Sequence, residues 1–162
     1  MRTILIGLGN PILGDDACGW RVVDRVEQQL QHKPQEVWQE IDSICLSIGG
    51  LGLMEHLIGY DRAIIVDAVS TGKAAPGTVS LQALEEMPDL SAGHTTSVHD
   101  TSLQNSVRLA RIMGINLPGT IIVVGIETHT SYTFTEGLTE AVAEAVPQAV
   151  QIINELLSAQ KG

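Results

Sequence analysis

An apolar run that ends in a glycine-bracketed turn constrains the fold of this chain more than any other feature. Residues 3–8 (TILIGL) form a predicted buried strand, and Gly7 and Gly9 then bracket a tight turn. Two adjacent carboxylates, Asp15 and Asp16, follow at the mouth of a predicted helix. In open α/β sheets, ligands and catalytic groups collect at the carboxyl ends of parallel strands. The opening of the chain therefore predicts a functional site there.

The rest of the chain alternates strand-like and helical patterns. We expect further strands near 37–44, 63–66, 78–81 and 120–125, and helices over 16–32, 51–59, 103–113 and 138–157. The strand at 78–81 follows the preceding one so closely that a hairpin-type antiparallel edge is natural. Pro147 predicts a kink or two abutting helices, because proline disrupts a helix interior. The expected fold is a three-layer α/β domain over 1–162, mostly parallel with one antiparallel strand.

Composition limits the classes of partner. Aromatic residues make up 3% of a chain that is 44% hydrophobic, so Ile, Leu, Val and Ala must build the core. A net charge of -10 without any basic cluster argues against nucleic acid and anionic membranes. No apolar run reaches membrane-spanning length and no signal peptide opens the chain, which predicts no membrane insertion. Cys18 and Cys45 form no disulfide framework, so we expect a cytoplasmic protein, and a core of this size needs no partner, which predicts a monomer.

Three polar side chains are the candidate site residues. Two adjacent carboxylates cannot both cap one helix in the same way, so Asp16 is the candidate if Asp15 takes the cap. Asp67 follows four apolar residues and is either a turn former or a site residue at the end of its strand. His99 lies in a predicted polar loop at 86–100, where a histidine is either a surface residue or a ligand. Lower priority goes to His94, His129, His32, His56 and Glu127.

Asp16, Asp67 and His99 would converge at one edge of a doubly wound sheet. Two carboxylates and an imidazole suit a divalent transition metal with open coordination positions. Other site classes are disfavoured: the sequence holds no zinc-protease helix, no serine elbow and no nucleophilic cysteine context. The glycine turn resembles a dinucleotide fingerprint, but Ile12 stands where its third glycine belongs and Asp42 is a weak ribose ligand.

These residues resemble the hydrogenase maturation endopeptidases over nearly the whole chain. The likeness rests on the order and spacing of several short motifs: Gly7-Leu8-Gly9-Asn10, Asp15-Asp16 with Gly19, Ile65-Val66-Asp67-Ala68, Pro76-Gly77-Thr78, Ser97-Val98-His99, Val124-Gly125-Ile126 and Gly137-Leu138-Thr139. The resemblance implies a twisted five-stranded sheet with helices on both faces. It also implies an endopeptidase that removes the C-terminal extension of the [NiFe]-hydrogenase large-subunit precursor, the last step of maturation.

The resemblance further implies that Asp16, Asp67 and His99 bind a metal, nickel, which the precursor supplies and the free enzyme holds weakly. Some family members carry glutamate at the position of Asp16. Nickel would either polarise the scissile carbonyl or activate water, or serve only in recognition while Asp16 acts as general base.

Two other functions compete with cleavage. A nickel-dependent client-binding protein or chaperone of hydrogenase assembly could use the same three ligands without cutting its client. The opening turn also resembles peptidyl-tRNA hydrolase, but that family's tyrosine and its Thr-Arg-His-Asn element are absent here. The sequence therefore favours the protease.

Overall fold

A five-stranded mixed sheet forms the centre of the computed structural model, which describes residues 1–34, 39–87, 98–129 and 133–159. At residues 51 and 98–102 it describes the backbone only. The strands are β1 (Thr3–Leu8), β2 (Ile41–Leu46), β3 (Arg62–Val69), β4 (Val79–Ala83) and β5 (Thr120–Glu127). Their order is β2-β1-β3-β5-β4, in which the first four are parallel and β4 is antiparallel to β5. The expected three-layer α/β fold is confirmed.

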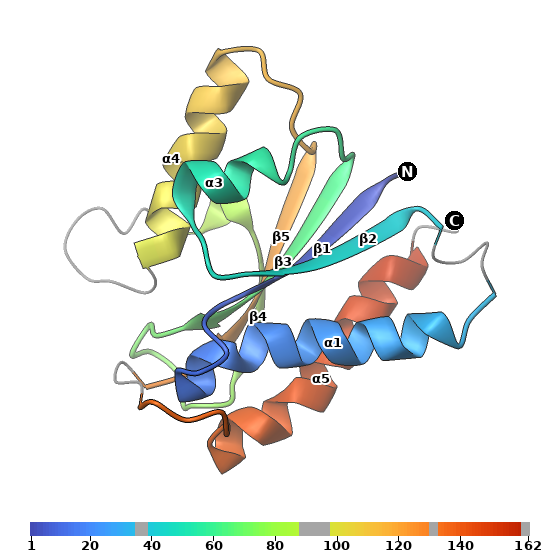
Figure 1. Cartoon of the computed structure of the whole chain (residues 1–162). Coiled ribbons are helices and arrows are strands. Elements are labelled where there is room, and N and C mark those ends of the chain that lie inside the picture. The colour runs from blue at the N-terminus through green and yellow to red at the C-terminus, as the bar shows by residue number, and fades with distance from the viewer. Residues whose placement is uncertain (35–38, 88–97, 130–132, 160–162) are drawn as a thin grey trace.

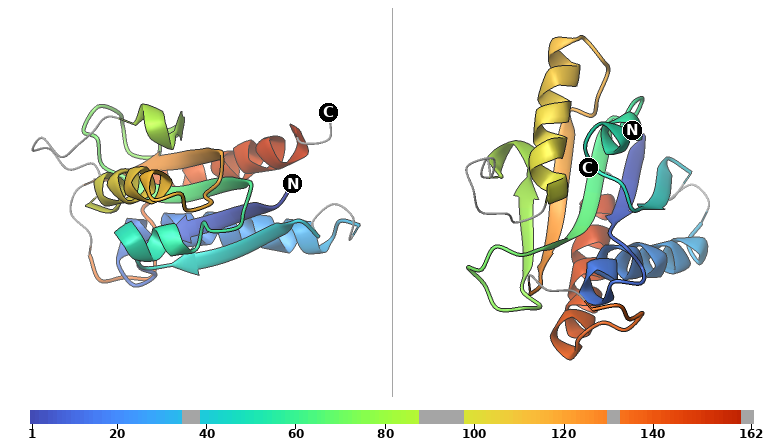
Figure 2. Two further views of the ribbon diagram at one scale, coloured as in Figure 1. Left: turned by 90° about the horizontal axis from the view of Figure 1, so that it is seen from above. Right: turned by 60° about the vertical axis from the view of Figure 1, so that its left-hand side comes forward.

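Helices cover both faces of this sheet (Figures 1 and 2). The helical segments are η1 (Gly14–Ala17), α1 (Cys18–Gln31), α3 (Gly50–Glu55), η2 (Leu84–Glu86), α4 (Val98–Ile112) and α5 (Glu140–Ser158). The side chain of Leu5 joins the core under α1 and α5, whereas its neighbours Ile4 and Ile6 join the core under α3 and α4. This alternation is the period of a strand that is buried on both faces. Among the described helices, none is long and apolar enough to cross a membrane.

The antiparallel strand has a different partner from the one expected. The short spacing between β3 and β4 favours a hairpin, yet β4 pairs with β5, with Val79 opposite Ile126. Strand β5 already occupies the edge of β3 over its whole length, from Arg62 opposite Thr120 to Val69 opposite Glu127. The residues after β3 therefore cross over the end of β5 before the chain turns back.

Two further expectations about element ends are wrong. Strand β3 does not end before Asp67 but continues through Ala68 and Val69, which are both buried. Helix α4 begins at Val98, so His99 lies in its first turn rather than in a loop. The other residues of that expected loop at 88–97, His94 included, lie outside the described residues.

Helix α5 runs without a break from Glu140 to Ser158, with Pro147 inside it. Pro147 lacks the N–H that would bond the carbonyl of Ala143, so the helix lacks one internal hydrogen bond. Its apolar stripe, which includes Val146 and Val150, is buried against the core shared with α1. This burial holds the helix together, and two abutting helices are not formed.

The site is positioned by a change in direction of the chain at β1. From β1 the chain passes through α1 to β2 on one side, and from β2 through α3 to β3 on the other side. Because α1 and α3 lie on opposite faces, the carboxyl ends of β1 and β3 form the switch point of the sheet, where ligands bind in open α/β folds.

Candidate active site

Glycines allow the start of α1 to lie directly on the strands. A Cβ on Gly19 would lie 2.4 Å from the carbonyl oxygen of Val66 and 2.5 Å from that of Leu8. Gly9 has a φ of 132°, and a Cβ there would lie 1.8 Å from the carbonyl oxygen of Asp16. Side chains at these two positions would push the acidic turn away from the sheet. The glycines therefore serve close packing, which accounts for the motif without any nucleotide.

Asp16 is fixed by the turn that precedes it. Its Oδ2 accepts a hydrogen bond from the backbone N–H of Asn10 at 2.8 Å, and Oδ1 of Asn10 in turn accepts from the N–H of Ile12 at 3.2 Å. The Asp16 side chain is partly exposed, and its Oδ1 has no partner among the described residues. One carboxylate oxygen thus orients the group, while the other remains available to a ligand.

Asp15 does not cap the helix that follows it. It is buried and accepts hydrogen bonds from the backbone N–H and the hydroxyl of Thr139, at 2.7 and 2.9 Å. Thr139 is the residue that precedes α5, so Asp15 joins the turn after β1 to the start of the last helix. The two adjacent carboxylates still differ in role. Asp15 makes a structural contact, and Asp16 is partly exposed.

Asp67 enters the same region from the middle of β3. It is only 1% exposed and pairs in register with Gly125 of β5. The pairing of β1 with β3 ends one residue earlier, at Gly7 opposite Val66. Asp67 is therefore the first residue of β3 beyond the last pair that β3 makes with β1. Strand periodicity directs it to the face of α3 and α4.

Cys18 is buried at the start of α1 and lies within the field of three carboxylates. Burial raises the pKa of this thiol most, and the negative charges of Asp67, Asp15 and Asp16 raise it further. Cys18 is therefore protonated and unsuited to be a nucleophile, because thiolate is the reactive form. The negative charges of Asp67, Asp15 and Asp16 all act on this thiol, and the joint site of Asp16 and Asp67 stays a prediction.

His99 has the right backbone position, while its side chain lies outside the described residues. Helix α4 leads into the start of β5 within a few residues, so its first turn lies at the other end of the sheet, where the parallel strands finish (Figure 1). That is the end at which Asp16 and Asp67 lie. Among all described residues, Asp16 and Asp67 included, no group of three or more His, Cys, Asp or Glu side chains is suited to a metal. The metal-binding role of His99 remains a prediction.

Glu127 is a buried carboxylate to which the sequence pattern gave low priority. It is 3% exposed and accepts hydrogen bonds from the N–H of Thr71 at 2.8 Å, the N–H of Gly72 at 3.0 Å and the hydroxyl of Thr71. Its own carbonyl accepts from the N–H of Gly77 at 2.8 Å. Glu127 thus holds both ends of the segment that leaves β3 after Asp67. The signal that drew attention to Asp67, an acid after an apolar run, also marks Glu127.

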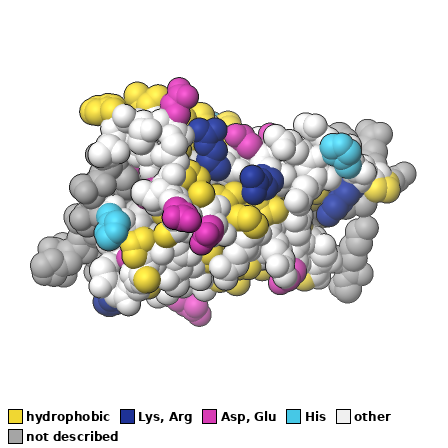
Figure 3. Space-filling model, turned by 90° about the horizontal axis from the view of Figure 1, so that it is seen from below, with side chains coloured by type: hydrophobic (Ala, Val, Ile, Leu, Met, Phe, Trp, Pro, Cys, Tyr) yellow, Lys and Arg dark blue, Asp and Glu magenta, His cyan; other side chains and the backbone are white. Residues whose placement is uncertain are grey.

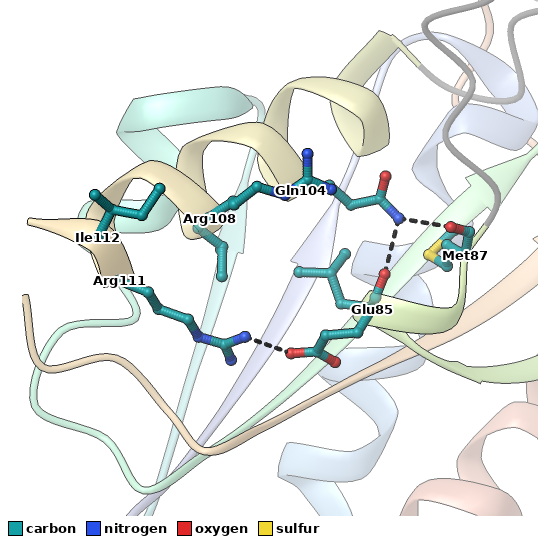
Figure 4. A pocket seen from close by; sticks show the side chains of 8 residues that line it. Glu85, Met87, Gln104, Arg108, Arg111 and Ile112 are labelled. Atoms are coloured by element: carbon teal, nitrogen blue, oxygen red, sulfur yellow. Dashed lines mark hydrogen bonds and ion pairs between the residues drawn. The ribbon is translucent and has the colours of Figure 1, made fainter.

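A separate hollow lies along α4, at the end of that helix remote from His99 (Figure 4). Gln104 donates hydrogen bonds to the carbonyl oxygens of Leu84 and Met87, at 2.8 and 3.0 Å, and Arg111 pairs with Glu85 at 2.8 Å. These contacts fasten η2 to α4. None of the carboxylates of the candidate site lines this hollow.

Basic side chains are dispersed on the face seen in Figure 3. There, Lys and Arg stand apart from one another among acidic and uncharged groups. A surface that binds a phosphate backbone needs clustered cations. On this face the basic side chains do not form such a cluster.

Comparison with known proteins gives a consistent result. A family model described as hydrogenase maturation protease matches residues 20–156. The hydrogenase 2 maturation protease of Escherichia coli is 30% identical over 157 residues, covering 93% of this chain and 92% of that protein. A hydrogenase expression/formation protein of Cupriavidus necator is 27% identical and covers 95% of this chain and 73% of its own length.

Solved structures agree with the sequence comparisons. The hydrogenase maturating endopeptidase HybD of E. coli superposes with a TM-score of 0.81 at 27% identity, covering 99% of this chain and 94% of that one. The [NiFe] hydrogenase maturation protease HybD of Thermococcus kodakarensis gives a TM-score of 0.73 at 21% identity, covering 97% and 99%. The second comparison supports the fold alone.

Proposed function

This chain belongs to the hydrogenase maturation protease family, and from that premise we propose that it trims the C-terminal extension of a nickel-loaded [NiFe]-hydrogenase large-subunit precursor. As a member of this family it is a hydrolase that acts on peptide bonds. The observation that supports the proposal is the placement of Asp16 in the turn after β1 and of Asp67 inside β3, the parallel neighbour of β1. His99 completes the proposed site.

The donor chemistry of the site suits a divalent transition ion. Two carboxylates and an imidazole form such a ligand set. Asp16 has one oxygen without a partner among the described residues, and Asp67 is held rigidly in a central strand. The nickel belongs to the precursor, so it is part of the substrate. Once bound, the nickel ion would supply polarisation of the scissile carbonyl or activation of a water molecule.

The chain's own groups supply position and proton transfer. The N–H of Asn10 holds Oδ2 of Asp16, so Oδ1 is the oxygen positioned to accept a proton from an attacking water. Asp67 cannot swing away, because it lies inside β3 among packed neighbours. Under this proposal an empty precursor fails to complete the site, and specificity comes from the state of assembly of the client.

A cleavage assay with matched variants tests the proposed residues. Nickel-loaded precursor is incubated with wild type, Asp16→Asn, Asp67→Asn, His99→Ala or Asp24→Asn, and the product is weighed by mass spectrometry. Asp24 is an exposed carboxylate of α1 outside the site, so its variant serves as the control. We expect a loss of roughly 100-fold or more in the three site variants and wild-type rates in the control. Folded Asp16→Asn and Asp67→Asn proteins that cut at the wild-type rate would refute the assignment.

Cellular location and oligomeric state belong to the same proposal. Both cysteines are free thiols, which is typical of a reducing compartment. The two hydrophobic clusters are buried within the single chain. These observations support a cytoplasmic monomer that meets its client in solution, with the client's large-subunit precursor as its partner.

A further inference from the structure

An exposed phenylalanine lies beside the acidic turn. Phe134 is the single phenylalanine of the chain and is 86% exposed, the largest exposure among the large hydrophobic side chains of the described residues. Ile12, in the turn after β1, is 49% exposed. Aromatic side chains normally contribute to stability by burial, and exposed ones are frequent anchors of interfaces.

The backbone holds these two residues in neighbouring register. The N–H of Thr135 donates to the carbonyl oxygen of Ile12 at 3.0 Å, and the N–H of Gly14 donates to that of Thr135 at 2.8 Å. These bonds form a parallel bridge between Leu13 and Thr135. Ile12 and Phe134 each precede a residue of this isolated bridge, so their backbones lie side by side.

The ladder is fixed at several points. Arg21 donates from its guanidinium to the carbonyl oxygen of Glu136 at 3.0 Å, and the N–H of Gly137 donates to the hydroxyl of Thr135 at 3.2 Å. Asp15, two residues beyond Leu13, bonds Thr139. The segment is thus pinned to the body of the protein while it keeps Phe134 in solvent. Because the backbone of this segment is already ordered, a partner that binds there pays little for ordering it.

From this arrangement we propose that Ile12 and Phe134 form an apolar strip that binds a hydrophobic segment of the client precursor beside the bond that is cut. The inference rests on the proposed function for the identity of the client. The client is chosen as the occupant because of where the strip lies. Only Leu13 and Gly14 separate Ile12 from the acidic pair Asp15 and Asp16. Ile12 is also tied to the Asp16 turn, because its N–H donates to Oδ1 of Asn10 and the N–H of Asn10 donates to Oδ2 of Asp16.

Binding and kinetics test the strip separately from catalysis. The affinity of nickel-loaded precursor is measured by biolayer interferometry on Asp67→Asn protein, alone and combined with Phe134→Ser, Phe134→Leu, Ile12→Ser or Ile112→Ser. Ile112 is 78% exposed on α4 and away from the site, so it is the matched control. We expect Phe134→Ser to weaken binding about tenfold or more, Ile12→Ser less, and Phe134→Leu and Ile112→Ser little. In otherwise wild-type protein, Phe134→Ser should raise KM far more than it lowers kcat.

The outcomes separate the strip from the proposed function. Equal affinities for Phe134→Ser and Ile112→Ser, in folded proteins, would overturn the strip whether or not the wild type cuts. A wild-type dimer that Phe134→Ser converts to a monomer would assign the strip to self-association and also overturn the proposal. Phe134-dependent binding without any cleavage by the wild type would support the strip and remove the protease function.

Discussion

The carboxylate of Asp15 accepts two hydrogen bonds from Thr139, one from its backbone N–H at 2.7 Å and one from its hydroxyl at 2.9 Å. These residues are 124 positions apart in the sequence. Their contact joins the first turn of the chain to the start of its last helix. It also leaves the neighbouring Asp16 partly exposed, so a structural bond separates the roles of two adjacent carboxylates.

Removal of the Asp15–Thr139 contact should destabilise the fold. Hydrogen bonds to charged groups contribute about 1.5–3 kcal/mol, so Asp15→Ala should lower the free energy of unfolding by about 2–3 kcal/mol and Thr139→Val by about 1 kcal/mol. Urea unfolding of both variants and the double variant measures the coupling. The exposed Asp24→Ala should change stability by less than about 0.5 kcal/mol. An Asp15→Ala protein as stable as Asp24→Ala would contradict this account of the turn.

The close approach of α1 to the sheet predicts intolerance of a single methyl group. Gly19→Ala would place Cβ within 2.4–2.5 Å of two backbone oxygens, which cannot move as side chains do. We expect a loss of about 3 kcal/mol in spite of the better helix propensity of alanine. Gly119→Ala, with no atom within 4 Å of the added Cβ, is the control and should be nearly neutral. Thermal unfolding of both variants tests this prediction. Equal midpoint temperatures for the two variants would refute the steric argument.

Glu127 should control the segment after β3. Glu127→Ala removes the acceptor of the N–H groups of Thr71 and Gly72, leaving a cavity at a buried position. We expect destabilisation of about 2–4 kcal/mol and faster amide hydrogen exchange at Thr71 and Gly72 than at β1 residues. Exchange followed by NMR measures both effects. Unchanged protection of Thr71 and Gly72 would show that the carboxylate does not hold this segment.

Cys45 predicts a loss of stability at alkaline pH. Burial, together with the charges of Asp24 and Glu27, raises the pKa of its thiol from 9.0 to about 12. Because the folded pKa is the higher one, the stabilisation is fully present below pH 9 and is lost as pH rises from 9 towards 12. Urea midpoints measured across this range should fall less steeply in Cys45→Ser than in wild type. Parallel curves for the two proteins would show that Cys45 does not carry the effect.

Local patterns predicted the layers well because periodicity reports burial. The alternation of Ile4, Leu5 and Ile6 between two cores follows directly from strand geometry. Periodicity does not predict which strands pair, because pairing depends on which edge of the sheet is still unpaired. The partner of Val79 is Ile126 of β5, a strand that comes much later in the chain.

The candidate site was predictable in part. Asp16 comes after β1 and Asp67 lies near the end of β3, two parallel neighbours whose carboxyl ends share one edge of the sheet. The end of β3 was misplaced because a charged residue usually marks the end of an apolar strand. Here Asp67 lies inside the strand, just beyond the last residue pair that β3 makes with β1. The contact of Asp15 with Thr139 leaves no local signal, since its partners are distant in sequence.

The most direct test of the central claim is the action of wild-type protein on a matched pair of large-subunit precursors, one loaded with nickel and one without it. The products are followed by gel shift and mass spectrometry. This account predicts that only the nickel-loaded precursor is shortened, by release of its C-terminal extension. Stable binding of the loaded precursor without shortening, by folded protein, would contradict the claim and indicate a nickel-dependent client-binding protein.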